Sequence, residues 1–311
     1  MKLKINSILF FLLIVSTLSA QTLRVVSYNV ENLFDWKHDS LKNDLEYTST
    51  GLRHWTYSRY KNKTEQIARV IVNISKEKPL ALIGLCEIEN ENCVQNLNYK
   101  LRHFHYRTLH YESSDERGVD VALLYDPKQF RLIDSAALYV DLGEDHTRDI
   151  LYAAGIIANG DTLHIMVCHL PSMIGGKTAS QWKRDQAKKV IQTKIDSIYS
   201  QQPNASIIIM GDMNSSPVND LLGVENMMLT YEKKGKGTHK YHGIWTCLDQ
   251  FYVSPYVQEN CKTTIYDAVF LMEKDVKFLD LKPKRTFVGY RYNKDGYSDH
   301  LPIYMEMKIN Y

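Results

Sequence analysis

Several apolar runs in the sequence end in a side chain that can bind a metal ion, move a proton or contact a phosphate. In chain order such runs end in Asn29, Glu87, His169, and Asp212 with Asn214. Asp249 lies inside an apolar run, and Asp299 with His300 lies at the edge of another. In α/β proteins, ligands gather at the carboxyl ends of the strands. The pattern therefore indicates that these strand ends converge on one site.

Each of these segments, taken alone, also has a structural explanation. Asp212 and Asn214 are spaced to activate and orient a water, but the same spacing is typical of an Asx turn. Glu87 follows an apolar run, so it either pairs with a cation or lies at the surface end of its strand. Asp299 beside His300 suits a metal ligand or a histidine whose charge is tuned. A lone histidine such as His169 is more often structural than catalytic.

The order and spacing of these segments resemble those of the endonuclease/exonuclease/phosphatase family, along the whole chain after residue 20. The closest resemblance is to bacterial extracellular nuclease-like members, which carry segments like Tyr28–Phe34 and Arg117–Tyr125. The resemblance implies an α/β (α+β) fold with four layers, in which two packed mixed β-sheets are flanked by helices.

The same resemblance implies a role for each residue. The metal ligands would be Glu87, Asn29 and Asp299, and the ion Mg²⁺ or Mn²⁺. Phosphate would be bound by Asn29 and Arg148. The catalytic residues would be His169, Asp212, Asn214, Asp249 and His300. Asp212 would activate the attacking water and Asp249 would orient His300 through a hydrogen bond, although the roles of Asp212 and His300 can be exchanged. Asp299 would support the metal or His169, and Arg148 is equally suited to a surface ion pair with Asp149 or Asp145.

Short β-branched apolar runs predict strands. These runs are Leu23–Val30, Leu80–Ile88, Val119–Tyr125, Thr162–Leu170, Ser206–Met210, Cys247–Val253 and Leu301–Met307. Apolar residues at helical spacing predict helices around Ile67–Ile74 and Ala187–Ile198. No linker interrupts the pattern, so we expect one domain from residue 21 to residue 311.

Residues 1–20 have the pattern of a signal peptide, with Lys2 and Lys4 before the apolar run Ile8–Val15 and small residues at Ser19-Ala20. We therefore expect export to the periplasm or the medium, without stable membrane insertion.

Removing Lys2 and Lys4 takes Lys+Arg from 38 to 36, which equals the 36 Asp+Glu. A net charge of zero excludes a protein that coats nucleic acid through a general basic excess.

The sequence thus predicts a secreted, monomeric, Mg²⁺-dependent phosphodiesterase, with nucleic acid as the expected substrate. The glycine-containing basic loop Lys233–Gly237 is expected to lie beside the site and hold a polyanion. The alternatives are a phosphomonoesterase, a lipid-headgroup phosphodiesterase, or an inactive binding protein on the same scaffold. A lipid-directed enzyme should carry an exposed aromatic hairpin, which the sequence does not clearly reveal. Buried free thiols are favoured for the cysteines, but a Cys247–Cys261 disulfide is permitted.

Overall fold

The computed structural model describes residues 21–76, 78–173, 175–176 and 178–310. The predicted signal peptide, residues 1–20, lies outside the described residues. Within the described part of the chain, every helix is too short or too polar to cross a bilayer.

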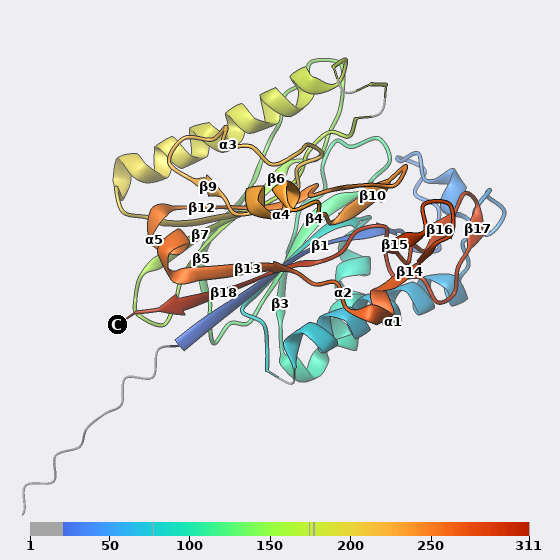
Figure 1. Cartoon of the computed structure of the whole chain (residues 1–311), viewed down its shortest axis with the longest axis horizontal. Coiled ribbons are helices and arrows are strands. Elements are labelled where there is room, and N and C mark those ends of the chain that lie inside the picture. The colour runs from blue at the N-terminus through green and yellow to red at the C-terminus, as the bar shows by residue number, and fades with distance from the viewer. Residues whose placement is uncertain (1–20, 77, 174, 177, 311) are drawn as a thin grey trace, which may run out of the picture.

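Two six-stranded mixed sheets form the body of the molecule (Figure 1). The first sheet contains, in spatial order, β13 (Cys261–Ile265), β18 (Ile303–Ile309), β1 (Gln21–Leu33), β2 (Leu82–Ile88), β4 (Asp120–Tyr125) and β3 (Arg107–His110). The second contains β5 (Arg131–Leu138), β6 (Ile150–Ile156), β7 (Thr162–His169), β8 (Ser206–Asp212), β12 (Asp249–Val253) and β9 (Glu225–Asn226). Each sheet has one parallel pair at its centre, β1 with β2 and β7 with β8.

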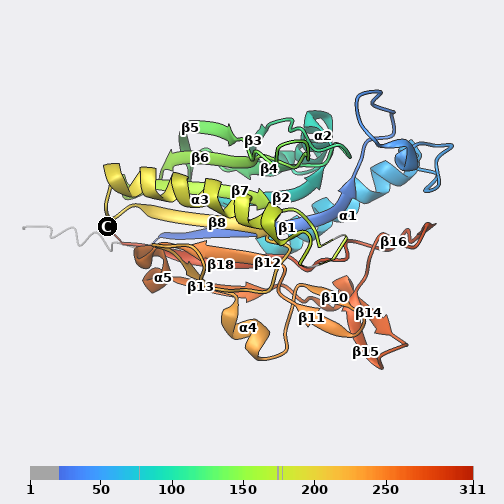
Figure 2. The same ribbon diagram turned by 90° about the horizontal axis from the view of Figure 1, so that it is seen from above.

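Helices cover the outer faces of both sheets, which makes four layers (Figure 1). Helices α1 (Tyr57–Ser75) and α2 (Glu91–Lys100) lie on the side of the first sheet. Helix α3 (Gln181–Gln201) lies on the second sheet and, seen from above, runs in front of β7 and β8 (Figure 2). One apolar core fills the space between the sheets and reaches α1 and α2, and another lies between the second sheet and α3. The predicted four-layer α/β sandwich is confirmed.

Smaller elements lie around these layers. They are α4 (Leu229–Lys233), α5 (Pro255–Asn260), the 3₁₀ turns Leu45–Tyr47, Arg102–Phe104 and Val269–Leu271, and three hairpins: β10 (His239–Tyr241) with β11 (Ile244–Thr246), β14 (Met272–Asp275) with β15 (Asp280–Pro283), and β16 (Phe287–Val288) with β17 (Arg291–Tyr292).

Burial explains why the central strands were easy to predict. Every residue of β8 is buried, and its sequence is a nearly continuous apolar run, as expected for a strand covered on both faces. Strand β18 instead alternates buried and exposed residues in its second half. All predicted strands and both predicted helices are present. The strands β5 and β6 and the helix α2 were not predicted, because β6 contains Ala and Gly and α2 is rich in Asn, a weak helix former.

The cysteines are free thiols in the described structure, so the permitted Cys247–Cys261 disulfide is not formed. Cys247 is buried and Cys261 is partly buried.

Two of the strand ends depart from regular geometry at the point where they approach each other. Glu87 has a φ of 67°, and the pairing registers of β2 shift beside it. A left-handed conformation costs a non-glycine residue about 1–2 kcal/mol, and such strain is often found at functional sites. Gly211 has a φ of 140°, and a Cβ there would lie 1.8 Å from the carbonyl oxygen of Cys168. Glycine at this position therefore allows β7 and β8 to run close together up to their polar ends.

Candidate active site

A cleft of about 660 Å³ lies where the carboxyl ends of β1, β2, β7 and β8 meet. Its lining includes most of the predicted site residues: Glu87, Arg148, His169, Asp212, Asn214, Asp299 and His300. The other two, Asn29 and Asp249, are fully buried and contact residues that line the cleft. The structure thus brings together residues that are more than 270 positions apart in the chain.

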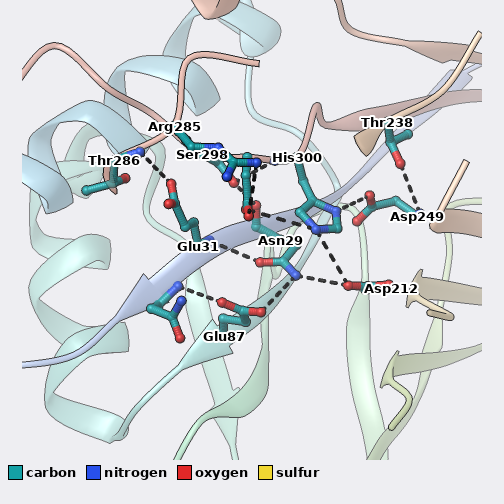
Figure 3. Close-up of polar contacts among 12 residues, drawn as sticks. Asn29, Glu31, Glu87, Asp212, Thr238, Asp249, Arg285, Thr286, Ser298 and His300 are labelled. Atoms are coloured by element: carbon teal, nitrogen blue, oxygen red, sulfur yellow. Dashed lines mark hydrogen bonds and ion pairs between the residues drawn. The ribbon is translucent and has the colours of Figure 1, made fainter. Parts of the chain in front are cut away.

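The carboxamide of Asn29 joins the two sheets (Figure 3). Its Nδ2 donates to Oε1 of Glu87 at 3.2 Å and to Oδ2 of Asp212 at 3.1 Å. Its Oδ1 accepts from the backbone N–H of Glu31 at 3.0 Å. Asn29 therefore presents its nitrogen, not its oxygen, to the carboxylates, and in this arrangement it positions Glu87 and Asp212.

Glu87 is turned into the cleft by its left-handed backbone. Its Oε2 accepts from the backbone N–H of Asn32 at 2.8 Å, and its side chain keeps 14% of its surface exposed. Each oxygen of a carboxylate has more than one acceptor site. Glu87 can therefore keep these hydrogen bonds and still offer an oxygen to a cation in the cleft.

Asp249 and His300 form the predicted hydrogen bond. Oδ2 of Asp249 lies 2.7 Å from Nδ1 of His300, and the Asp249 carboxylate is completely buried. Burial alone would lower the pKa of His300, but the carboxylates of Asp249 and Asp212 outweigh it and hold that pKa well above its ordinary value. The imidazole is therefore charged at neutral pH. Its Nε2 faces Asp212, with 3.8 Å between Nε2 and Oδ2.

His169, in contrast to His300, is neutral. Burial, reinforced by the positive charge of Arg148, holds the pKa of His169 well below its ordinary value. A neutral imidazole has one acceptor nitrogen, and Nη2 of Arg148 lies 3.2 Å from Nε2 of His169. Arg148 is itself buried and its Nη1 lies 3.5 Å from Oδ2 of Asp115. The alternative of a surface ion pair between Arg148 and Asp149 or Asp145 is therefore wrong.

Asp212 and Asn214 form the Asx turn that the sequence allows and also place both side chains at the site. Oδ1 of Asp212 accepts from the backbone N–H of Asn214 at 2.9 Å, which is an Asx turn, and both side chains reach the cleft. Nδ2 of Asn214 donates to the carbonyl of Leu170 at 3.0 Å. Burial, with the nearby charges of Asp249 and Glu87, raises the pKa of Asp212 to about 6 even though the charge of His300 opposes this.

Asp299 lies beside His300, with Oδ1 of Asp299 4.0 Å from Nε2 of His300. Its Oδ2 lies 3.9 Å from Nη2 of Arg285. Asp299 also forms a group with His239 and His300 whose ligand atoms are within 4.8 Å of one another.

His239 was missed in the sequence, because it lies in a short hairpin without a recognisable motif. Its ring packs 4.8 Å from that of His300. Burial and the charge of His300 lower the pKa of His239 to about 4, so it is neutral.

Hydrogen bonds from residues with no catalytic role fix the position of the segment that carries His300. The hydroxyl of Ser298 donates to the carbonyl of Asn29 at 2.7 Å and accepts from the backbone N–H of His300 at 3.1 Å. The buried carboxylate of Glu31 accepts from the backbone N–H groups of Thr286 at 2.5 Å and Phe287 at 3.2 Å (Figure 3). These contacts tie the segment before His300 to β1. Glu31 lies within the family-like segment Tyr28–Phe34, but the sequence assigned no role to it or to Thr286.

The basic loop does not lie beside this cleft. Lys233, Lys234 and Lys236 line a different hollow, together with Lys262 on β13. The prediction that this loop frames the site is therefore wrong. Within the cleft itself, the guanidinium groups come from Arg117 and Arg148.

The donors in the cleft fit a hard divalent cation. Glu87 and Asp299 supply carboxylate oxygens, and Mg²⁺ prefers oxygen ligands and needs only one or two carboxylates beside waters and a substrate phosphate. A charged His300 cannot coordinate a metal, because both of its nitrogens carry protons. Glu87 and Asp299 are therefore the residues best suited to hold the ion.

Comparison with known proteins agrees with this geometry. Residues 24–309 match the model of the Endonuclease/Exonuclease/phosphatase family. No curated protein matches the chain in sequence. TDP2 from Caenorhabditis elegans has a similar structure, with 18% identity, a TM-score of 0.60 and coverage of 93% of this chain and 75% of that one. The human Nocturnin catalytic domain with a bound sulfate anion is 14% identical, with a TM-score of 0.58 and coverage of 92% of this chain and 93% of that one. D. rerio TDP2 complexed with a single-strand DNA product is 16% identical, with a TM-score of 0.55 and coverage of 92% of this chain and 98% of that one.

The family model covers nearly the whole of the described chain, and the neighbours share its two-sheet architecture. The carboxylates, imidazoles and guanidinium groups of the cleft are the groups that hydrolysis of a phosphoric ester requires. The chain therefore belongs to the endonuclease/exonuclease/phosphatase family and is a metal-dependent phosphoric-ester hydrolase.

Proposed function

We propose that this chain is an exported, monomeric, Mg²⁺-dependent phosphodiesterase that hydrolyses nucleic acid by attack of an activated water. One observation carries the proposal. The charged His300, held by Asp249, points its second nitrogen toward Asp212 at 3.8 Å, so a proton acceptor and a cationic donor face the same small space. The cationic donor suits a phosphoryl oxygen, and the proton acceptor suits the attacking water.

Asp212 is the general base in this mechanism. With a pKa raised to about 6 by burial, it is mostly ionised at neutral pH and is a stronger proton acceptor than an exposed aspartate. The N–H donors of Asn29 and Asn214 fix its two oxygens, which leaves its remaining lone pairs for the water. A positioned base typically contributes about 10²–10⁴-fold to the rate.

The cationic donors act on the phosphate. Nε2–H of His300 and the guanidinium of Arg148 are placed to stabilise the charge that develops on the phosphoryl oxygens. Neutral His169 accepts from Arg148 and so keeps that guanidinium directed at the cleft. When bound at Glu87 and Asp299, the metal supplies Lewis-acid polarisation of a phosphoryl oxygen.

An apolar rim favours a substrate that carries bases on either side of the phosphate. Tyr241 and Ile244 face each other across the β10–β11 hairpin, line the cleft and keep 67% and 69% of their surface exposed. A nucleobase stacked on an aromatic side chain contributes about 1–3 kcal/mol. The neighbour D. rerio TDP2 complexed with a single-strand DNA product supports the same substrate class.

A second candidate, a lipid-headgroup phosphodiesterase, is favoured by a different hairpin. The β14–β15 turn exposes Val276 at 80% and Leu279 at 92%, and Phe278 at 40%. The sequence did not clearly reveal an exposed aromatic hairpin, and this one is mainly aliphatic, with Phe278 as its aromatic residue. Lys240 ties this hairpin to β10 through Asp280 at 2.8 Å, so its tip belongs to the same side of the molecule as Tyr241.

Export rests on the sequence pattern of residues 1–20. Protein recovered outside the cytoplasm should begin at or near Gln21 on N-terminal sequencing. Exported protein that still begins at Met1 would reject cleavage of a signal peptide, and protein found in the cytoplasm alone would reject export.

The first prediction concerns the substrate. Bis-p-nitrophenyl phosphate, single-stranded DNA and RNA should be cleaved faster than p-nitrophenyl phosphate, because the rim accommodates a group on each side of the phosphate. Tyr241→Ala should raise KM for single-stranded DNA by about 5–100-fold through lost stacking, whereas Leu279→Ser should leave that KM unchanged. Sphingomyelin or phosphatidylcholine vesicles cleaved faster than DNA, with sensitivity to Leu279→Ser, would establish the second candidate instead.

The second prediction concerns the metal. Activity should be lost in EDTA and restored by Mg²⁺ or Mn²⁺, and Glu87→Gln should lower kcat by at least about a hundredfold, because a metal contributes several kcal/mol to the transition state. The exposed Glu144→Gln provides the matched control and should keep full activity. Undiminished hydrolysis in EDTA, or by the Glu87→Gln protein, would contradict the assigned ligand.

The third prediction tests whether Asp249 and His300 act as a unit. Asp249→Asn and His300→Gln should each lower kcat by about 10²–10⁴-fold, and the double variant should lose little more than either single one. Thermal unfolding of each variant controls for damage to the buried site. Losses that multiply in the double variant would show that the two residues act independently.

A further inference from the structure

A second cluster of potential metal ligands lies outside the catalytic cleft. His110 ends β3, Glu112 follows two residues later, and Asp120 begins β4. Each offers one ligand atom, and these atoms all lie within 4.8 Å of one another. None of the three lines the cleft.

Strand pairing explains why these residues meet. His110 is the direct partner of Ala122 across the β3–β4 pair. Asp120 lies two residues before Ala122, so its side chain is on the same face of the sheet as that of His110. The ten-residue separation of His110 and Asp120 is therefore closed by the sheet.

Two buried polar atoms in this cluster face each other without a hydrogen bond. The side chains of His110 and Asp120 are each only 2% exposed, and Nε2 of His110 lies 3.9 Å from Oδ2 of Asp120. Neither atom has a hydrogen-bond partner within the described part of the structure. The distance is too long for a hydrogen bond, and a movement of a few tenths of an ångström would bring both atoms to about 2.0–2.2 Å from one metal ion.

Further carboxylates surround the same imidazole. Nδ1 of His110 lies 3.8 Å from Oε1 of Glu112 and 3.9 Å from Oε2 of Glu91 on α2. The other oxygen of Asp120 accepts from the hydroxyl of Ser113. Burial lowers the pKa of His110 to about 4 and raises that of Asp120 to about 7, so neither group is stable in its charged form without a partner.

We propose that His110, Glu112 and Asp120 form a structural site for a divalent transition-metal ion, separate from the catalytic metal. A buried carboxylate and an imidazole left facing each other are costly unless a cation joins them. Imidazole together with carboxylates suits Zn²⁺ or Mn²⁺ better than Mg²⁺, which selects oxygen ligands alone. Glu112 is 57% exposed and gives the ion a route from solvent.

The ion would fasten the segment 111–119 between β3 and β4. This segment carries Asp115, which lies 3.5 Å from Arg148, and Arg117, which lines the cleft. The proposed site therefore braces one wall of the catalytic cleft without contacting the substrate. The proposal does not depend on the substrate or on the catalytic metal.

Zinc binding to the full chain, stripped with EDTA, tests this site. In a Glu87→Gln background, which weakens the catalytic metal site, equilibrium dialysis with Zn²⁺ should give one ion per chain. X-ray absorption of that ion should reveal one imidazole nitrogen among oxygen ligands. Adding His110→Gln should abolish binding, and Glu112→Gln should weaken it by at least about tenfold. The melting temperature of the Glu87→Gln protein should rise by roughly 4 °C or more at a hundredfold excess of Zn²⁺ over its Kd.

Glu116→Gln is the matched control, because Glu116 is an exposed residue of the same segment, and it should leave zinc affinity unchanged. Glu112→Gln alters a half-exposed side chain and keeps the test decisive if His110→Gln does not fold. The proposal is overturned if both variants bind Zn²⁺ as the Glu87→Gln parent does, or if the parent binds none. Neither outcome bears on the catalytic role of Glu87, which the EDTA and kcat measurements test separately.

Discussion

The site depends on how several carboxylates are kept close together in a poorly solvated place. Glu87, Asp212 and Asp249 lie at the ends of different strands and Asp299 lies in the segment before β18, and like charges at short range destabilise one another. One amide and one imidazole relieve this repulsion: Asn29 donates to Glu87 and Asp212, and charged His300 lies between Asp249 and Asp212. These contacts therefore reduce the repulsion around Asp212, the proposed proton acceptor, and Glu87, the proposed metal ligand.

The rest of the fold follows from the need to deliver these groups to one point. The parallel pairs β1–β2 and β7–β8 place strand ends from two sheets side by side. Close approach requires Gly211, whose backbone admits no Cβ, and a strained Glu87 that turns into the cleft. The apolar core between the sheets stabilises the fold and offsets this local strain. The strained strand ends that carry the catalytic groups thus depend on the stability of the core, while the helices cover the outer faces of the sheets.

Much of this arrangement could be predicted because local patterns carry it. Apolar runs marked the central strands, and the polar residue ending each run marked the site. The apolar strand around Asp249 indicated only that this carboxylate needs a partner, and the family resemblance was needed to name His300 as that partner. Long-range geometry was not accessible in the same way: nothing near His239 signals that its ring packs against His300. The loop Lys233–Lys236 lies between two site motifs in sequence but lines another hollow, together with residues of α5 and β13 that are close to it only in the folded chain.

The central claim is that Asp249 keeps His300 charged while His169 stays neutral. Histidine-ring ¹⁵N NMR of the chain at pH 7.5, assigned with single-histidine variants, measures both states directly. The account predicts two protonated nitrogens on His300 and one on His169, and a neutral His300 in the Asp249→Asn protein. A neutral His300 in the unaltered protein at this pH, or a His300 that stays charged without the Asp249 carboxylate, would contradict it.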